Sequence, residues 1–511
     1  MKHDAASEWS RLDGLRRGFI TRCEQYANYT LPRLCTPTGF NPINDELSHD
    51  WHSVGAQAVN HVTNKLVLTL FAPSRPSFRL EADKQFKASA IANGIPEASI
   101  DEALARGEQE ATKELDRRGT TRPKLYQLLN NLVVLGNVLA YFPTEKKEDV
   151  RVFGIKNFVV RRTGSGKVKT CIVREQLLFD ELEPDVQAAC RAAKSHYQPD
   201  TKVDYFRWLE RQADGKYRMS QWVGSTRLPS EYEGHWPEDK CPWRVLTWQL
   251  ADDSDYGTGL VEDFAADFSG LSSLSEAQIK GAILSSEFRW LVNPGGMTKP
   301  EDLMESENGA ALPGLEGDIA LVSNSKPGDL QVVQSVAGDY IRRIGQGFLL
   351  GSAVTRDAER VTAAEIRQQA QELETSFGGA YSRIAVDLQN PLARWLLQSV
   401  NLDVNKTQIK ITIVTGLDAL SRGGDLDSLR SALADIAALG QVPPDQVAKL
   451  ELEMIYTTIF NGHGLPASKY VKSAEKQQAE AKATQDAAAA QTNAEAGSKA
   501  AADQIVQQGN Q

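Results

Sequence analysis

The sequence predicts an α+β protein that is mainly helical and carries one β-rich module inside the helical chain. Three observations predict this class. Apolar residues recur every three or four positions through the first third of the chain, the pattern becomes strand-like between about residues 150 and 250, and the helical period returns at Leu260. A chain of 511 residues with 41% hydrophobic residues can bury a large core, which we expect to divide into two or more modules.

The first third of the chain predicts four helical segments. Pro32 closes the first segment, and Pro73 and Pro76 stop the second. The third is charged and is expected to be helical and largely solvated, whereas the fourth is strongly apolar. The segments span Leu12–Tyr26, Trp51–Leu70, Asp83–Arg118 and Leu125–Leu139.

Two hairpins are predicted in the β-rich module. The first turns at residues 163–166, which read Thr-Gly-Ser-Gly, and the second turns at Asp214-Gly215. The flanking runs are rich in β-branched and aromatic residues, which are typical of strands. The expected strands span Val150–Arg161, Val168–Leu178, Val203–Leu209, Tyr217–Val223 and Trp243–Leu250.

A long helix is predicted from Leu260 to about Phe288, and the Asn-Pro-Gly-Gly run at 293–296 ends it. A small insert follows at 297–337, with strand-like runs at Ile319–Val322 and Leu330–Val333. A second helical face then appears at Tyr340, Ile344 and Phe348.

The clearest local signal for a helix start lies at residues 361–366. Thr362 and Glu365 have the spacing of a capping box, and Val361 and Ile366 that of a hydrophobic staple. The helix is expected to run to Trp395 with bends at Gly378-Gly379 and at Pro391. A further helical region is expected at 425–460, and the tail from about 473 to 511 is expected to be frayed helix or disordered.

Composition excludes several classes of protein. The chain has 57 basic and 67 acidic residues, so its net charge of −10 does not favour tight binding to phosphate backbones. Its five scattered cysteines indicate reduced, mostly buried thiols. No signal peptide or membrane-spanning segment is predicted.

No catalytic motif is found, so neither an enzyme nor a cofactor is expected. Residues 164–167 read Gly-Ser-Gly-Lys, but a phosphate-binding loop needs four residues between its glycines and Ser or Thr after the lysine. A hairpin turn is the favoured interpretation. His49 and His52 lie close in the sequence without partner cysteines, so we expect a solvated loop there and no zinc site.

Two further clusters have a structural and a functional interpretation. Asp252, Asp253 and Asp255 precede Gly257 and have the chemistry of a Mg²⁺ site, but acids at the start of a helix are the commoner case. The β-rich module mixes aromatic and arginine side chains that could stack single-stranded bases, although aromatic packing of a sheet is favoured. The members of this second cluster are Tyr205, Trp208, Tyr217, Trp222, Arg207, Arg211 and Arg218.

Several segments, in their order along the chain, resemble the portal proteins of short-tailed bacteriophages, also called podophages. The resemblance covers most of the chain and weakens at 83–118, in the insert and in the tail. The matching segments are Trp51–Ala56 with Asn64–Leu66 and Leu70–Pro73, Leu132–Leu139, Tyr256–Gly259 with Leu291–Gly295, Ser352–Val354 with Glu359–Ile366, and Thr415–Leu420 with Gly423–Asp427.

The resemblance implies a portal-type fold with a helical wing that includes the β-rich module, long stem helices, a small α/β clip and a helical crown. It implies these boundaries: wing 1–255, stem helix 256–291, clip 292–337, second stem helix 338–351, tunnel loop 352–361, wing helix and return 362–424, crown 425–472 and low-complexity tail 473–511.

The resemblance also implies a ring, usually of twelve subunits, at one vertex of the capsid in the virion. Double-stranded DNA would enter and leave through the ring. The implied partners are the terminase large subunit, the major capsid and scaffolding proteins, a tail adaptor and internal core proteins, with assembly in the host cytoplasm and no membrane.

Two sets of residues are then candidates for facing DNA. Glu262, Asp263 and Asp267 fall on the expected stem helix, where they either line the channel or are ordinary solvated acids. Arg356 and Arg360 fall on the expected tunnel loop. There they would form a positive constriction, or else pair with Asp357 and Glu359 in the same loop.

Two rival functions were weighed against a portal. Another ring-forming virion protein, such as a tail adaptor, would equally lack catalytic motifs. A packaging nuclease-ATPase would need a nucleotide-binding loop and a carboxylate metal cluster, and the sequence shows neither convincingly.

Overall fold

The computed structural model describes residues 4–71, 76–95, 97–144, 148–193, 197–286, 288–307, 311, 314–315, 317–323, 327–350, 372–373, 375–402, 409–413 and 434. The chain divides into two units, Met1–Gly416 and Leu417–Gln511. Ala434 alone is described in the second unit, so the expected crown and tail lie outside the described residues. All elements below belong to the first unit.

The first predicted helix is two helices, α1 (Ala5–Leu15) and α2 (Arg17–Tyr29), because Arg16 leaves the helical conformation. The buried Arg16 guanidinium donates to the carbonyl oxygens of Ile155 and Phe158, at 2.7 and 2.6 Å. Leu15, inside the predicted helical segment Leu12–Tyr26, is 68% exposed. The next helix, α3 (Val54–Leu70), follows the prediction, although Trp51 lies outside it and is exposed.

The charged stretch is helical as predicted, in α4 (Lys84–Ala92) and α5 (Glu97–Arg117). The expectation that it is largely solvated is wrong for α5, which buries Ala111 and Leu115. Glu108 is also buried there, and its carboxylate accepts a hydrogen bond from the Leu80 backbone N–H at 2.9 Å. An amphipathic helix with many charges can therefore still pack one face into the core.

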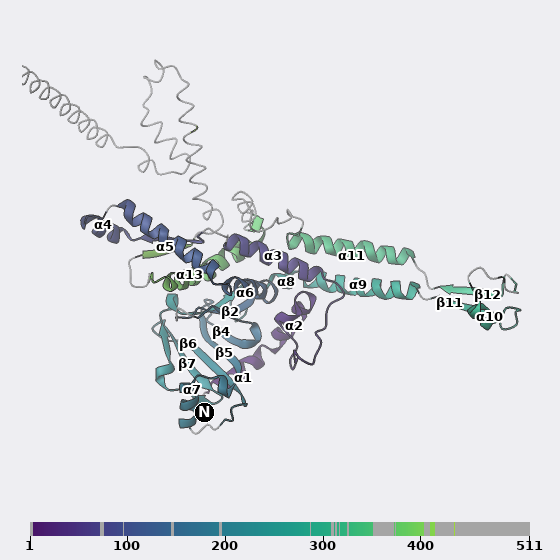
Figure 1. Ribbon diagram of the computed structural model, residues 1–511, viewed down its shortest axis with the longest axis horizontal. Helices are drawn as coiled ribbons and strands as arrows, with labels where there is room; N and C mark the ends of the chain where they lie inside the picture. The colour runs from purple at the N-terminus through teal and green to yellow at the C-terminus, as the bar shows by residue number, and fades with distance from the viewer. Residues whose placement is uncertain are drawn as a thin grey trace, which may run out of the picture. The chain divides into compact units, whose positions relative to one another are not determined.

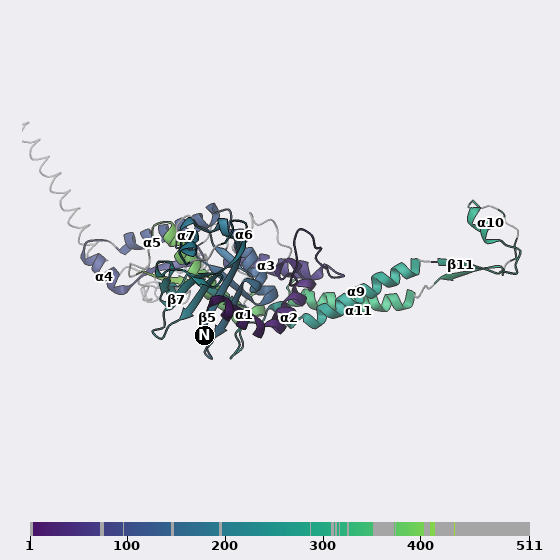
Figure 2. The same cartoon turned by 90° about the horizontal axis from the view of Figure 1, so that it is seen from below.

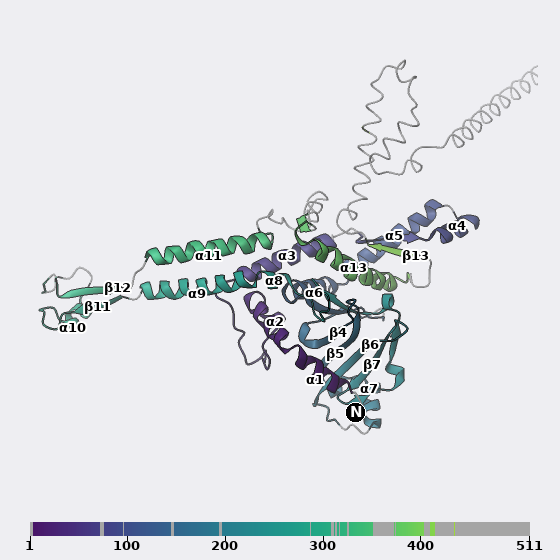
Figure 3. The same cartoon turned by 180° about the vertical axis from the view of Figure 1, so that it is seen from behind.

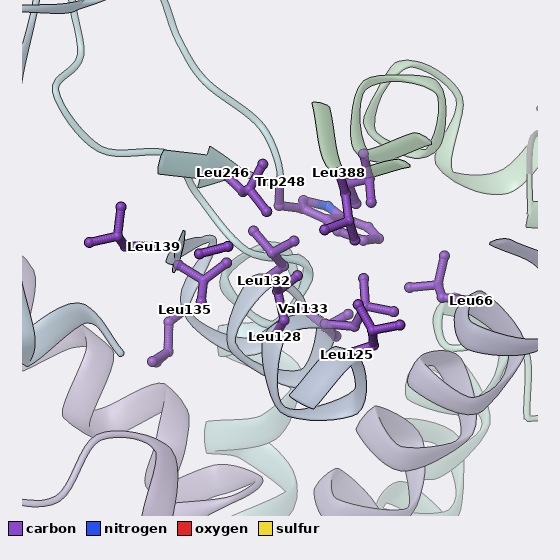
Figure 4. Packing of buried hydrophobic residues seen from close by; sticks show 14 of the residues in the cluster. Leu66, Leu125, Leu128, Leu132, Val133, Leu135, Leu139, Leu246, Trp248 and Leu388 are labelled. Atoms are coloured by element: carbon purple, nitrogen blue, oxygen red, sulfur yellow. The ribbon is translucent and has the colours of Figure 1, made fainter. Parts of the chain in front are cut away.

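The apolar segment forms α6 (Thr121–Leu135), the centre of the main core (Figure 4). Leu139 was expected on this helix but lies in strand β2 (Asn137–Tyr141). Gly136 ends the helix because it adopts φ 69°, a left-handed conformation that glycine reaches without a Cβ penalty. Figure 4 shows Leu246, Trp248 and Leu388 from other elements packed around this helix.

Both predicted hairpins are confirmed, and they build a six-stranded antiparallel sheet. Its path is β4-β5-β6-β7-β8, and β9 pairs with β7. The pairs Cys171 with Leu209 and Leu209 with Met219 place apolar residues on the face that joins the main core. The elements are β4 (Phe158–Arg162), β5 (Val168–Leu178), α7 (Pro184–Ala192), β6 (Lys202–Arg211), β7 (Tyr217–Val223), β8 (Thr226–Arg227) and β9 (Gly234–Trp236).

A second sheet has the order β10-β2-β3. The predicted strand Val150–Arg161 is divided between the two sheets, because Gly154 and a short 3-10 turn at Ile155–Asn157 separate β3 (Arg151–Phe153) from β4. The predicted strand at Trp243 is confirmed as β10 (Trp243–Thr247). Another antiparallel pair, β1 (Phe78–Ala82) with β13 (Ile409–Ile413), was not predicted.

The long helix predicted from Leu260 is interrupted at Phe264, giving α8 (Leu260–Asp263) and α9 (Ala265–Ser286). α9 ends at Ser286, close to the predicted end at about Phe288. Phe288–Val292 then forms strand β11, paired with β12 (Ile319–Ser323). A short helix, α10 (Pro300–Glu305), lies between these strands.

The predicted strand at Leu330–Val333 is wrong: these residues belong to α11 (Pro327–Gly347). The strand preference of valine depends on its surroundings, and here the helical face formed by Ala337 and Ile344 is buried. α11 therefore starts before residue 338, the boundary expected for a second stem helix. Figures 1 and 2 show α9 and α11 side by side with the β11–β12 hairpin at one end, an arrangement hereafter called the helix pair.

The last long helix is α13 (Gly379–Ser399), which continues through Pro391. Gly378, with φ 45°, interrupts the helical conformation just before α13, at the position where the sequence predicts a bend. Figure 3 shows α13 beside β13 and near α5, and it contacts both. The predicted capping box at Thr362 lies outside the described residues.

All five cysteines are free and buried, as predicted. Among the described residues, no helix combines the length and hydropathy that a bilayer crossing requires.

Candidate functional site

The three predicted stem acids lie at the base of the helix pair, and the four predicted loop residues are not described. Arg356, Asp357, Glu359 and Arg360 all fall in 351–371, outside the described residues. Glu262 and Asp263 end α8, and Asp267 lies in the first turn of α9.

A backbone junction fixes where the helix pair starts. Gly136 and Gly259 pack directly together: a Cβ on Gly259 would lie 2.8 Å from the Gly136 nitrogen and from two α6 carbonyl oxygens. The fully buried Asn137 amide donates to the Gly257 carbonyl at 2.7 Å and accepts from the Gly257 N–H at 2.8 Å. The sequence Tyr256-Gly257-Thr258-Gly259 is therefore a tight backbone crossing, and no larger residue fits at 259 without moving α6.

Two of the three predicted acids face cations of the same chain. The Asp267 carboxylate lies 3.2 Å from the Arg343 guanidinium on α11. Glu262 lies 4.0 Å from Arg22 on α2, at a partly exposed position. These contacts connect α11 and α2 to the start of the α8–α9 segment. The nearby guanidinium groups neutralise part of the charge of Asp267 and Glu262.

Asp263 differs from the other two acids. It is exposed, and no ion pair is found for it among the described residues. Its pKa is raised above the ordinary value because neighbouring groups desolvate the carboxylate. Of the three candidates, Asp263 is the one whose charge is left for an external partner.

Aromatic rings link the start of α9 to the end of α11. Phe348 packs against Phe264 and Phe268, with ring centroids 5.4 and 5.8 Å apart. Gly347 makes room for this contact, because a Cβ there would lie 2.1 Å from the Phe264 ring. The base of the helix pair is thus a packed core.

His52 was expected in a solvated loop, and this is wrong: its side chain is 6% exposed. Its Nε2 lies 3.1 Å from the Asp50 carboxylate, and its ring stacks on Phe268 of α9. The Ser272 hydroxyl donates to the same carboxylate. The loop before α3 therefore docks on the helix pair, and His49 alone keeps the expected exposure.

The sequence pattern did not single out Lys65, a buried lysine of α3 that contacts Leu349 just after the end of α11. The Lys65 ammonium lies 3.0 Å from Glu372 and 3.4 Å from the Leu349 carbonyl oxygen, and only 2% of the side chain is exposed. His61, one helical turn earlier, contacts the same carbonyl at 3.0 Å. These contacts tie α3 to Leu349 and to Glu372. The detectable signal was a lysine within the buried face of a predicted helix, next to Leu66.

The outer part of the helix pair exposes apolar residues in two rows, one on each helix. Ile279 and Ile283 on α9 are 42% and 55% exposed, and Val332 and Val336 on α11 are 64% and 39% exposed. In each row the residues are four apart, so they share one helix face. Gly281 faces Leu330 of α11, and both isoleucines stand about 200° around α9 from that contact.

The segment between β11 and β12 is organised by Asp318, which is 4% exposed. Its carboxylate accepts hydrogen bonds from the backbone N–H groups of Met297, at 2.9 Å, and Leu315, at 3.3 Å. These donors lower the pKa of Asp318. Met297 and Leu315 themselves are 68% and 67% exposed.

The alternative sites weighed from the sequence gain no support in the described part of the chain. Gly164–Lys167 is a hairpin turn closed by the Thr163 N–H on the Lys167 carbonyl at 2.8 Å. Asp255 is used structurally, because its side chain lies 3.1 Å from Arg161 and accepts from the Arg162 N–H. No cluster of metal-ligating side chains is found among the described residues.

The aromatic and arginine side chains of the β module pack the sheet, as the favoured interpretation predicted. Tyr205, Trp208 and Tyr217 are buried. The Arg207 and Arg218 guanidiniums pair with buried glutamates, Glu175 and Glu233.

Comparison with known proteins gives one family over nearly the whole chain. Residues 2–471 match the family described as bacteriophage head to tail connecting protein. The portal protein of Escherichia phage T7 is 31% identical over 483 residues, covering 93% of this chain and 89% of that protein. The portal protein of Pseudomonas phage phiKMV is 30% identical over 503 residues, covering 96% of both.

Solved structures show lower similarity. The neck of an empty gene transfer agent (GTA) particle covers 81% of this chain and 90% of its own, with a TM-score of 0.40 and 13% identity. The virion of a native GTA particle covers 88% of this chain and 93% of its own, with a TM-score of 0.39 and 12% identity.

Proposed function

The chain belongs to the bacteriophage head to tail connecting proteins, and we propose that its copies close into a ring around a channel for duplex DNA. The similarity to podophage portal proteins makes it a portal-type connector, and it does not favour the alternative of a tail adaptor. Genome packaging and ejection through the channel are the roles that follow from this family. The ring, its subunit number and its contacts are the proposal.

The two exposed apolar rows of the helix pair carry the proposal. A closed ring needs two different and complementary surfaces on each subunit. The row of Ile279 and Ile283 lies on α9, and the row of Val332 and Val336 lies on α11, so one chain offers two such surfaces. We assign them to each other in neighbouring copies, as expected for a ring of usually twelve subunits.

The energetics agree with this assignment. Full burial of an isoleucine or valine side chain contributes about 1.5–3 kcal/mol, so covering a half-exposed one contributes about 1 kcal/mol. Four such residues at each interface would then contribute about 4 kcal/mol before the cost of association. Because every interface in a ring repeats this contribution, a modest row supports a stable assembly.

The acids at the base of the helix pair suggest how DNA would pass. A wall that attracted phosphates would hold the duplex through many salt-sensitive contacts, whereas an acidic wall allows sliding. Asp263 is the strongest candidate for the channel surface, because Asp267 and Glu262 lie near cations of their own chain. The net charge of −10 per chain fits such a wall.

The loop residues supply the second part of the channel proposal. Rings of Arg356 and Arg360 would form a local positive constriction around DNA, unless Asp357 and Glu359 neutralise them within the loop. Replacing both arginines by glutamine should then change DNA retention or packaging and leave the ring intact. Heads that package and hold DNA as before would contradict this role.

The remaining parts of the proposal concern partners and location. The exposed side chains of the β11–β12 segment, among them Met297 and Leu315, suit contact with the terminase large subunit and a tail adaptor. Contacts with the major capsid, scaffolding and internal core proteins would fall elsewhere on the ring. The ring would occupy one capsid vertex after assembly in the host cytoplasm, and it would act as a connector without catalytic activity of its own.

The double substitution Ile279→Asp and Ile283→Asp tests ring formation. Placing carboxylates in an interface that must exclude water should prevent assembly, so light scattering should give a much smaller mass than for the unchanged chain. The matched control is Ile43→Asp, because Ile43 is 89% exposed in the loop before α3. The ring proposal fails if the double variant assembles as the control does, or if the unchanged chain stays monomeric at high concentration.

A further inference from the structure

A cavity of about 310 Å³ lies between the β-rich module and α13. The end of β4, the hairpin turn at Gly166, the segment before β10 and one face of α13 line it. Four cationic and three acidic side chains lie in this lining.

The buried polar groups of the lining that have no hydrogen-bond partner are all donors. Arg162 Nη2, Arg244 Nε and Trp243 Nε1 are buried nitrogens with no hydrogen-bond acceptor among the described residues. All three are donors, and no lining oxygen in the described part of the chain is left in the same state. Buried polar groups in proteins are nearly always satisfied, so an unmatched group calls for a ligand, an ion or a water molecule.

Neither arginine makes an ion pair among the described residues, although the Asp387 carboxylate of the lining interacts electrostatically with both. Arg162 donates to the backbone carbonyls of Gly166 and Asp255, at 2.9 and 3.2 Å, and Arg244 donates to the Asp239 carbonyl at 2.5 Å. No carboxylate lies within ion-pair distance of either guanidinium in the described residues. Their pKa values are lowered, chiefly by desolvation of the charged form.

The lining acids are engaged elsewhere or lie at the rim. Glu238 pairs with Lys167 and Arg211, at 3.1 and 3.2 Å. The Asp239 carboxylate pairs with Arg394 at 3.2 Å. Asp387 is about half exposed and lies 3.8 Å from Arg383, which is not in the lining. The lining therefore carries one more cationic than acidic side chain, and its three buried donors have no acceptor among the described residues.

From this cavity, its unmatched donors and its two unpaired guanidinium groups, we propose that the wing binds a small oxyanion between Arg162 and Arg244. A phosphate or carboxylate group offers acceptors only, which is what the three nitrogens require. The volume accommodates such a group with room to spare. The three donor atoms are buried, so we expect anion binding to turn the two guanidinium groups toward the cavity.

Calorimetric titration of the full chain tests the site, with inorganic phosphate in one arm and acetate in the other, at constant ionic strength in chloride. We expect saturable binding at one site per chain. A charge-assisted hydrogen bond to an anion corresponds to about ten- to hundredfold in affinity, so Arg162→Gln and Arg244→Gln should each weaken binding by that factor. The matched control, Lys169→Gln, removes an exposed charge outside the lining and should bind as the unchanged chain does.

Val386→Glu provides a test that does not depend on buried groups. Val386 lies on the cavity lining and is 53% exposed, so a glutamate there adds negative charge at the mouth without disturbing the core. Binding should be lost while circular dichroism and ring mass stay unchanged. The ratio of the two arms identifies the group as phosphoryl or carboxylate. Absence of saturable binding in both arms, or equal affinity in all variants, overturns the proposal and leaves water as the acceptor.

Discussion

Apolar side chains are buried around α6 and the sheets packed on it, hereafter called the body, but they are exposed on the outer part of the helix pair. In the body, Leu125, Leu128 and Leu132 are fully buried by other elements of the same chain (Figure 4). On the helix pair, Ile283 and Val332 remain more than half exposed. The body therefore completes its core within one chain, whereas the helix pair is built to have its surface covered by something else.

Charged side chains show the same contrast. In the body, buried carboxylates can face two cations at once, as where Glu175 meets Arg151 and Arg207. The helix pair carries exposed pairs along one helix, such as Asp339 with Arg342 at 2.8 Å, which contribute little to stability. Folding energy is concentrated in the body, and the helix pair is free to serve assembly.

The largest expected effect compares one truncation in each region. Leu132→Ala in the body should lower the free energy of unfolding by about 2–5 kcal/mol, because it leaves a cavity in a packed core. Val332→Ala should change the stability of the dissociated chain by less than about 0.5 kcal/mol, since it removes exposed atoms. Urea unfolding of dilute protein measures both, and equal losses would erase the contrast between the regions.

The next effect concerns the contacts of Lys65 with Glu372 and Leu349, which link α3 to the end of α11 and are hereafter called the joint. Lys65→Met keeps the side-chain volume but leaves Glu372 and the Leu349 carbonyl without their buried cation. We expect a loss of about 2 kcal/mol, reduced from that of a fully buried pair because Glu372 is 29% exposed. Thermal unfolding measures it, with Lys113→Met on the exposed side of α5 as the control. A variant as stable as the control would show that the joint is not held by this lysine.

Acid should weaken the same joint. Burial, reinforced by Lys65, lowers the pKa of His61 below its ordinary value of about 6.5. The folded protein then binds fewer protons than the unfolded chain, so this contribution is full above about pH 6.5 and is lost as the pH falls below it. His61→Gln should flatten the stability profile in that window. An unchanged profile would place the acid sensitivity elsewhere.

The smallest expected effect concerns the reactivity of cysteine thiols in the two regions. All native cysteines are buried in the body, and burial raises the pKa of Cys171 to about 12 and that of Cys241 to about 11. They should not react with thiol reagents until the body opens. Ile283→Cys should react quickly in the dissociated chain and slowly in the ring. Equal rates in both states would show that this face stays uncovered.

Much of the fold was predictable because local patterns and local structure agree. The helical period gave α3 and α6, and Asp214-Gly215 gave a hairpin whose register follows from its turn. Predictions failed where a distant contact decides. Leu139 is in a strand because Gly136 must pack on Gly259, and Leu330–Val333 is helical because α11 packs along α9.

In the candidate site, too, the positions of residues could be predicted from the sequence, whereas their contacts could not. Glu262, Asp263 and Asp267 could be named from their position on a predicted helix. Their different states could not, since Arg22 and Arg343 that face two of them are far away in the sequence. Lys65 and the three unmatched donors of the wing cavity are visible only in the folded chain.

The sequence by itself determined the class of the protein, its helical and β-rich regions, its reduced cysteines and its resemblance to portals, because periodicity and segment order are properties of the chain. Tertiary structure alone decided which acids are neutralised, which glycines are crossing points and which apolar rows stay exposed. The physical reason is that burial and pairing depend on residues brought together from distant segments, and spacing along the chain does not record those distances.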